Sequence, residues 1–125
     1  MCPCRQTSTF LFYEFLKRYA LTLDQHEELL KHCDEIGIMY LCTPFSLKAA
    51  YELDELGVPA FKIGSGEMDD IPTLRAIAKL EKPMIVSTGM ATFEEIERTY
   101  AALSSSGISF ALMNCLSEYP HVMKM

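Results

Sequence analysis

Residues 60–86, AFKIGSGEMDDIPTLRAIAKLEKPMIV, contain a complete strand–helix–strand unit and decide the fold class. Two short apolar runs rich in β-forming residues, Ala60–Ile63 and Met84–Val86, flank a segment in which apolar residues recur at helical spacing. Asp70 is placed to cap this helix, and Pro72 is tolerated in its first turn because those N–H groups have no partner. Short continuous apolar strands joined by a helix indicate parallel strands in an α/β protein.

The same rhythm extends in both directions. Apolar runs also occur at Ile38–Cys42 and Ile108–Met113, so four expected strands begin about 22–24 residues apart. Each expected helix has a recognisable start signal. Thr22 with Gln25 and Thr92 with Glu95 have the spacing of a capping box. Ser46 and Asp70 can each act as a single cap. Two of these helices have an apolar stripe and are followed by a glycine, which is a common helix stop. The first stripe is Leu29, Leu30, Cys33 and Ile36, before Gly37, and the second, an expected buried face, is Ala50, Leu53 and Leu56, before Gly57.

Two architectures share this rhythm: an open doubly wound sheet and a closed (β/α)₈ barrel. A barrel uses about 250 residues, so four units in 125 residues are about half a barrel or a small open sheet. Periodicity alone does not choose between them. Residues 1–21 form a poorly defined N-terminal segment, in which we expect one further helical piece.

Composition restricts the partners and the compartment. The net charge of -6 makes nucleic acid an unfavourable partner, because phosphate binding relies on clustered Lys and Arg. The cysteines are odd in number and lack C-x-x-C spacing, which favours core packing over a reactive thiol or metal ligand. The start of the chain has only a short apolar run, too short for a signal peptide or a membrane span. We therefore expect a cytoplasmic protein without a membrane partner.

Small polar or charged residues follow each expected strand. In parallel α/β folds, ligands bind at the carboxyl ends of the strands. Four successive polar strand ends therefore predict one site built from several loops, although loops are polar in any case. The residues are Thr43 after the first strand, Ser65 and Glu67 after the second, Ser87 and Thr88 after the third, and Ser117 and Glu118 after the fourth.

Lys62 is the first candidate functional residue, because it interrupts the apolar run Ala60–Ile63 beside a Gly-Ser-Gly turn. A lysine on a central strand is costly to bury unless it meets an anion. It could be a point charge for a phosphate or carboxylate, a Schiff-base nucleophile, or a lysine whose amine reaches solvent at the sheet end.

The glycines of Gly64-Ser65-Gly66 and of Ser87-Thr88-Gly89 would allow backbone N–H groups to approach an anion closely. Neither sequence is a complete phosphate-binding motif, but together they outline a cradle for a phosphorylated or carboxylated ligand. The three histidines have no metal-ligand spacing, so the sequence predicts no metal site in this chain.

Four ordered blocks resemble successive signatures of the N-acetylneuraminate (sialic acid) synthase family. They are Thr43-Pro44-Phe45, Phe61-Lys62-Ile63-Gly64-Ser65-Gly66-Glu67, Lys82-Pro83-Met84-Ile85-Val86-Ser87-Thr88-Gly89-Met90-Ala91-Thr92 and Asn114-Cys115-Leu116-Ser117-Glu118-Tyr119-Pro120. The resemblance implies that residues 22–125 are part of a (β/α)₈ barrel with about four β/α units.

The resemblance also implies an activity. Family members condense phosphoenolpyruvate with N-acetylmannosamine or a related N-acetyl amino sugar, giving a nine-carbon sialic acid and phosphate. By similarity, Glu67 would lie near the reacting carbons and Tyr119 near the amino sugar. The residues that would contact phosphoenolpyruvate are Thr43, Lys62, Ser65, Ser87 and Ser117. Lys62 would hold the substrate through its charge. Lys62 and Glu67 would be the catalytic residues.

The chain also departs from the family pattern. Full-length members use Mn²⁺ or Mg²⁺ to polarise the sugar aldehyde, but their two metal-binding histidines lie on strands beyond Met125. The early strands, which carry a Glu and a second phosphate-binding Lys, have no counterpart before Thr22. By the same resemblance, we expect the C-terminal antifreeze-like domain, which full-length homodimeric relatives exchange between subunits, to lie outside these 125 residues.

We therefore expect this chain alone to be inactive and, with unpaired strand edges, only marginally stable. Two other functions stay open. One is a lysine-dependent aldolase that forms an imine on Lys62, and the other is a non-catalytic fragment that binds an anion.

Overall fold

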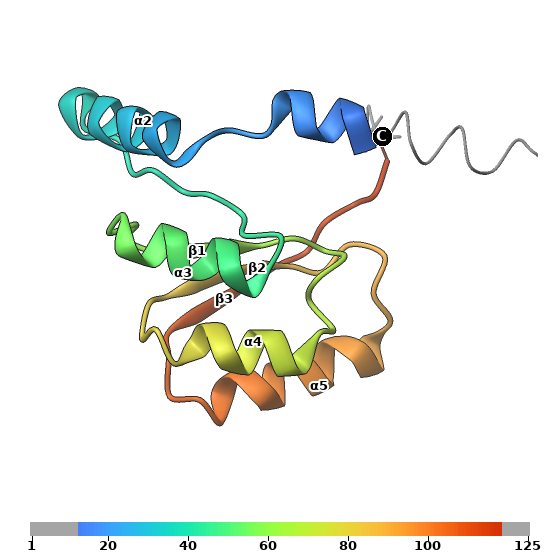
Figure 1. The fold of residues 1–125 in the computed structure, drawn as a ribbon. Coiled ribbons are helices and arrows are strands. Elements are labelled where there is room, and N and C mark those ends of the chain that lie inside the picture. Colours follow the sequence, from blue (N-terminus) through green and yellow to red (C-terminus); the bar gives the residue numbers. More distant parts are fainter. Residues whose placement is uncertain (1–12, 119–125) are drawn as a thin grey trace, which may run out of the picture.

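The computed structural model describes residues 13–118, which contain a three-stranded parallel sheet (Figure 1). The strands are β1 (Phe61–Ile63), β2 (Met84–Ser87) and β3 (Phe110–Met113), and their order in the sheet follows their order in the chain. In the register, Lys62 lies beside Ile85, and Ile85 lies beside Ala111. The parallel strands predicted at these three positions are confirmed.

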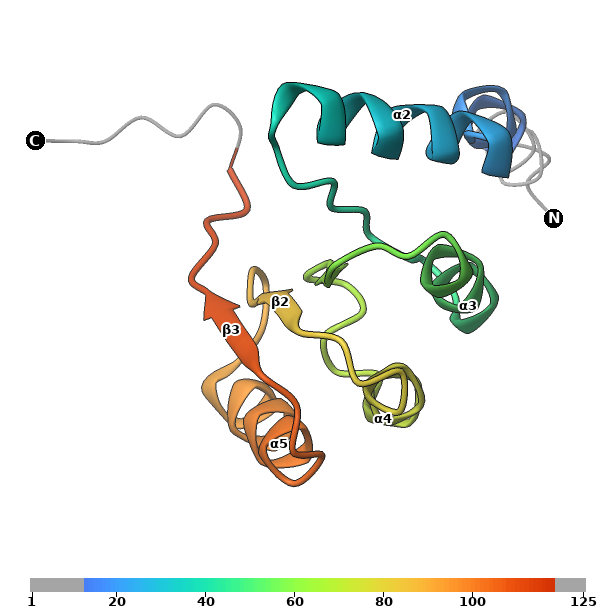
Figure 2. The same cartoon turned by 90° about the vertical axis from the view of Figure 1, so that its left-hand side faces the viewer.

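Three helices cover the same face of the sheet. They are α3 (Leu47–Glu55), α4 (Ile71–Ala78) and α5 (Phe93–Ser104), and Figure 2 shows them arranged in an arc along one side of the strands. The side chains between the two layers form the core, because alternate strand residues point to the helices. The buried strand residues of this core are Phe61, Ile63, Met84 and Val86, and its buried helical residues are Ala50, Leu53, Leu74, Ile77, Ala78 and Leu103.

The four predicted helix starts are confirmed. Thr22 with Gln25 and Thr92 with Glu95 both form complete capping boxes, in which each side chain bonds to the other residue's backbone N–H. Ser46 and Asp70 accept hydrogen bonds from Ala49 and Thr73 at the starts of α3 and α4. These contacts satisfy N–H groups that have no partner within the helix.

The strand predicted at Ile38–Cys42 is not present as a strand. In the segment 38–42, only Cys42 makes a bridge to Phe61, and Cys42 O accepts from Lys62 N at 3.2 Å. Ile38 and Met39 are exposed. Among residues 13–118, this segment has β1 on one side and no strand on the other, and an isolated short pairing is only marginally stable.

The apolar stripe predicted for α2 (Leu23–Ile36) is present in the helix but does not enter the core, because no residue of α2 is buried. The helix lies apart from the layer of α3, α4 and α5 (Figures 1 and 2), and Leu30 packs only at the edge of the core. A 2.6 Å hydrogen bond joins His26 Nδ1 to the Tyr40 hydroxyl. Burial and the neighbouring Cys42 raise the pKa of Tyr40 to about 12. Residues 13–19, within the predicted N-terminal segment, are helical.

None of the helices α3, α4 and α5 lies on the other face of the sheet (Figure 2). Lys62 and Ile85 alternate with the buried core residues of β1 and β2, so their side chains point to that face. Ala111, which pairs with Ile85, and Ser87, two residues after Ile85, point to the same face. The carboxyl ends of all three strands lie at the same edge of the sheet, because the strands are parallel. The polar residues that follow the strands are therefore neighbours in space.

Candidate functional site

Lys62 and Ser87 connect the two central strands at this edge. The Lys62 ammonium group donates to Ser87 Oγ at 2.5 Å and to the Ile63 carbonyl oxygen at 2.8 Å. Lys62 is half-buried and Ser87 is buried. Neither of these two partners is a carboxylate, so neither neutralises the charge of the amine. The ammonium group has a third hydrogen that these two bonds do not use, on the side of the sheet that α3, α4 and α5 do not cover. Such a group is suited to an anion.

Gly89 brings the two hydroxyls of Ser65 and Ser117 together. Gly89 N donates to Ser65 Oγ at 3.0 Å. A Cβ atom placed on Gly89 would lie 2.9 Å from Ser65 Oγ and 2.9 Å from Ser117 Oγ, closer than side chains tolerate. The absence of a side chain at Gly89 therefore allows loops that follow three different strands to approach one another.

Glu67 and Thr43 lie on the other side of Lys62 in the sheet. A Cβ atom on Gly64 would collide with Glu67 Oε2 and would lie 3.8 Å from Thr43 Cγ2. The Glu67 carboxylate thus folds back over Gly64, next to the end of the 38–42 segment. The turn that allows this is closed by Glu67 N, which donates to the Gly64 carbonyl oxygen at 3.2 Å.

Thr88 fixes the end of β2 to the end of β3. Its backbone N and its hydroxyl both donate to the Met113 carbonyl oxygen, each at 3.0 Å. The backbone that leads to Ser117 is thereby held beside the backbone that leads to Gly89. A hollow of about 220 Å³ borders this loop, and its lining includes Ser65, Gly89 and Glu95.

The Glu95 carboxyl at this hollow accepts hydrogen bonds from the Thr92 backbone and hydroxyl, and these bonds lower its pKa.

The structure therefore groups six of the seven predicted site residues at one edge of the sheet. The seventh, Tyr119, lies outside the described residues. One ammonium group and four hydroxyls, from β1, β2 and the loops beside them, could hold a small oxygen-rich anion, with one carboxylate beside it. The six residues are Thr43, Lys62, Ser65, Glu67, Ser87 and Ser117.

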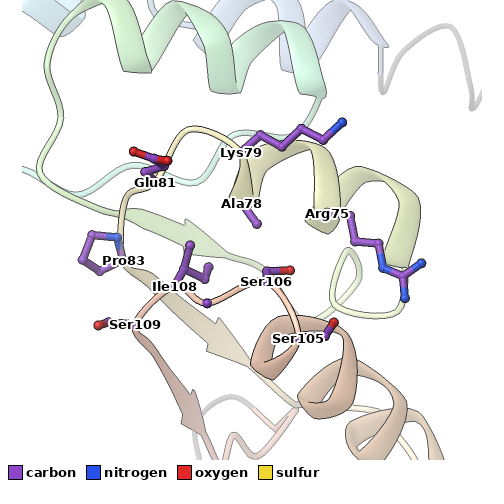
Figure 3. A pocket seen from close by; sticks show the side chains of 10 residues that line it. Arg75, Ala78, Lys79, Glu81, Pro83, Ser105, Ser106, Ile108 and Ser109 are labelled. Carbon is purple, nitrogen blue, oxygen red and sulfur yellow. The ribbon is translucent and has the colours of Figure 1, made fainter.

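A larger hollow lies at the opposite edge of the sheet and does not have this chemistry. It measures about 740 Å³ and lies where α4 and α5 end and where β2 and β3 begin (Figure 3). Arg75 and Lys79 extend in different directions in Figure 3. Ser105 and Ser106 both donate to the Ala102 carbonyl oxygen, so their hydroxyl protons are already used. Helix carboxyl ends also disfavour an anion.

Comparison with known proteins identifies the family. The family model described as NeuB family matches residues 4–125. The chain belongs to the NeuB family. It is 41% identical over 110 residues to an N,N'-diacetyllegionaminic acid synthase of Campylobacter jejuni, covering 86% of this chain and 33% of that protein. It is 37% identical over 98 residues to an N-acetylneuraminate-9-phosphate synthase of Drosophila melanogaster, covering 78% of this chain and 26% of that protein.

A solved relative shows the same arrangement of elements. The N-acetylneuraminic acid synthetase of Leptospira borgpetersenii, crystallised in complex with citrate, superposes with a TM-score of 0.78 at 28% identity. The match covers 82% of this chain and 36% of that one. The predicted resemblance to this family is thus confirmed, and the chain spans about a third of the length of the curated relatives it matches.

The described part of this NeuB-family chain offers no complete metal centre. No three His, Cys, Asp or Glu side chains within residues 13–118 lie close enough together to hold an ion. The divalent metal expected for full-length relatives does not fit the described residues by themselves. Over the same range, no helix is both long and apolar enough to span a membrane.

Sequence reasoning missed two residues near the site. Thr99 on α5 is fully buried and donates to the Met68 carbonyl oxygen at 2.7 Å. A sequence signal was present, since Thr99 interrupts an apolar stripe that includes Ile96 and Leu103. Met90, which follows Gly89, has a φ of 63°, a left-handed conformation that is uncommon for a residue with a side chain. No local pattern predicted this conformation.

Proposed function

We propose that this chain is the phosphoenolpyruvate-holding part of a NeuB-family sugar-acid synthase. The reaction is the condensation of phosphoenolpyruvate with N-acetylmannosamine or a related N-acetyl amino sugar. A bond forms between C3 of phosphoenolpyruvate and the aldehyde carbon, water adds at C2, and phosphate leaves. The product is a nine-carbon sialic acid or a bacterial relative of it.

The observation that carries this proposal is the position of the Lys62 ammonium group on Ser87, beside the serine pair around Gly89. Charge-assisted hydrogen bonds to a phosphate or carboxylate are about twice as strong as neutral ones. The relative from Leptospira borgpetersenii was crystallised in complex with citrate, a molecule with several carboxylates.

Each residue has a proposed role that follows from its chemistry. Lys62 balances the negative charge of phosphoenolpyruvate, and the hydroxyls of Ser65, Ser87 and Ser117 donate to its phosphate or carboxylate oxygens. Glu67, an acidic group next to that cradle, lies where it could exchange a proton with the reacting carbons. The divalent metal expected for the whole enzyme would use ligands outside residues 13–118.

We also propose that the described fold is part of a (β/α)₈ barrel. Strands that follow one another in order, with α3, α4 and α5 on a single face, support this architecture. A doubly wound sheet instead reverses its strand order and carries helices on both faces. In the barrel, the face with Lys62 and Ile85 would be the interior.

A chimaeric enzyme tests the function. Residues 22–118 would replace the matching third of the Campylobacter jejuni synthase, and the chimaera would be assayed for phosphate release from phosphoenolpyruvate with an N-acetyl amino sugar and Mn²⁺. We expect measurable activity with this segment and a loss of at least about 100-fold when it carries Lys62→Ala. A matched chimaera with Lys48→Ala, changed on the exposed side of α3, should keep its activity.

The outcomes separate the candidate functions. A folded chimaera that binds phosphoenolpyruvate but releases no phosphate would support a segment that only binds an anion. A folded chimaera whose activity is unaffected by Lys62→Ala would contradict the proposed site.

A further inference from the structure

Thr99 is a buried hydroxyl on α5 whose hydrogen bond goes to another element. The Thr99 side chain is fully buried, and its Oγ1 donates to the carbonyl oxygen of Met68, 31 residues earlier in the chain, at 2.7 Å. A threonine inside a helix commonly donates to a carbonyl one turn back in its own helix. Thr99 instead connects α5 to the loop between β1 and α4.

That loop carries two of the predicted site residues. Glu67 lies immediately before Met68 and Ser65 lies three residues before it, and the Met68 side chain is buried in the core. Met68 is thus held at two points, through its side chain by the core and through its carbonyl by Thr99. The Glu67 carboxylate and the Ser65 hydroxyl project from the short turn that ends at this anchor.

The same helix also holds the other half of the cradle. Gly89 lies in the segment that enters α5, three residues before the cap Thr92. Its N–H donates to Ser65 Oγ. Helix α5 is therefore connected to the Gly89 segment at its amino end and to the Ser65–Met68 loop through Thr99, so it sets the separation of these two loops.

We propose that Thr99 is a positioning residue for the anion cradle, acting through the Met68 carbonyl to hold Ser65 and Glu67 against Gly89. The ligand class is a small phosphorylated carboxylate, and this clause of the inference rests on the proposed function. A carbonyl left without its donor in the core would move toward another partner, because an unsatisfied buried acceptor is costly. The loop would then lose the geometry that its ligand needs.

Three variants of the chain separate the hydroxyl from its volume. Thr99→Val keeps the shape and removes the donor, whereas Thr99→Ser keeps the donor. Leu103→Val, on the same buried face of α5, reduces core packing and leaves the Thr99 hydroxyl and its hydrogen bond in place. Amide hydrogen exchange measured by NMR would report on the Glu67 amide, which donates to the Gly64 carbonyl oxygen, and on the Gly89 amide, which donates to Ser65 Oγ.

We expect Thr99→Val to raise exchange at Glu67 and Gly89 by about tenfold relative to other α5 amides. Thr99→Ser should exchange like the parent chain, and Leu103→Val should raise exchange along α5 without this local excess. Titration with phosphoenolpyruvate should show roughly five- to tenfold weaker binding for Thr99→Val alone. If Thr99→Val does not fold, Thr99→Cys, with its weaker donor, should show an intermediate effect.

Two results would overturn the inference: equal local exchange in Thr99→Val and Leu103→Val, or a Thr99→Ser variant as perturbed as Thr99→Val. A parent chain that shows no shifts with phosphoenolpyruvate, together with the expected exchange pattern, would refute the proposed ligand and leave Thr99 as the anchor of the loop. The failure of the positioning role and the failure of the function are thus distinguishable.

Discussion

The Lys62 ammonium group donates to Ser87 Oγ across 2.5 Å, from the middle of β1 to the last residue of β2. The two residues are 25 positions apart in the sequence and meet because parallel strands bring successive carboxyl ends together. The serine satisfies one hydrogen of the amine without neutralising its charge. The pair therefore keeps a positive charge available at the edge where the other hydroxyls gather.

Replacement of Lys62 by alanine should weaken phosphoenolpyruvate binding by roughly 10- to 100-fold, the usual cost of losing a charge-assisted hydrogen bond. Isothermal titration calorimetry on the chain would measure it. Ser87→Ala leaves the charge in place, so its effect should be smaller than that of Lys62→Ala. Equal affinities of the parent and the Lys62→Ala chain would show that the anion binds elsewhere.

The same lysine distinguishes the synthase from the aldolase. A Schiff-base aldolase would form an imine between Lys62 and pyruvate, and borohydride would reduce it to a stable adduct. We expect no mass increase on Lys62 after this treatment, because the proposed function uses Lys62 to hold an anion and forms no covalent bond to it. A peptide carrying a reduced pyruvate adduct on Lys62 would favour the aldolase.

Gly89 and Gly66 form a matched pair of glycines in the two site loops. Gly89→Ala would place a methyl group 2.9 Å from the hydroxyls of Ser65 and Ser117, whereas a Cβ on Gly66 meets nothing within 4 Å. Gly89→Ala should therefore weaken anion binding by about tenfold or more, and Gly66→Ala should change it little. Comparable losses in the two variants would point to a general effect of adding a side chain to these loops.

Local features of the sequence predicted local structure well. The caps at Thr22, Ser46, Asp70 and Thr92 were correct because each one depends on a side chain and a backbone group three residues apart. The strands β1, β2 and β3 were also predicted, because apolar runs bounded by loop residues are a short-range signal.

Features that depend on distant parts of the chain could not be predicted in the same way. The stripe on α2 has the pattern of a buried face, but burial requires a neighbouring element. Within residues 13–118, no residue of α2 is buried, and Leu30 is only partly buried against the core. The 38–42 segment has strand-like composition and only one neighbouring strand. The partners of Thr99 and Gly89 depend on how α5 and the loops after β1 and β2 pack against one another, and no local pattern specifies this packing.

The ion pair of Asp54 and Lys82 should contribute more stability than an exposed pair. Lys82 Nζ lies 2.5 Å from Asp54 Oδ1 and 3.2 Å from its carbonyl oxygen, and both side chains are largely shielded from solvent. A double-mutant cycle with Asp54→Ala and Lys82→Ala should give a coupling free energy of about 1 kcal/mol in urea unfolding.

The pair of Lys48 and Glu52 is the control for this cycle. Its atoms are 2.8 Å apart at positions i and i+4 of α3, but the Lys48 side chain is 84% exposed. Solvent screens such a pair, so the corresponding cycle should give a clearly smaller coupling than that of Asp54 and Lys82. A larger coupling for the exposed pair would contradict the role of burial.

The two capping boxes should respond differently to acid. Hydrogen bonds from the Thr92 backbone and hydroxyl to Glu95 lower the pKa of this carboxyl below the ordinary value of 4.5. A carboxyl with a depressed pKa stabilises the folded state above pH 4.5, and this contribution is lost as the pH falls through the lowered pKa. The start of α5 should therefore fray in this window.

The box of Thr22 and Gln25 at the start of α2 has the same hydrogen-bond pattern with an uncharged amide. Its amide exchange should not follow the same acid transition, and Glu95→Gln should make the start of α5 equally insensitive. NMR titration of the amides at both helix starts, from neutral pH to below pH 4.5, would measure this difference. Acid fraying that is the same at both starts, or that persists in Glu95→Gln, would show that the carboxylate is not its cause.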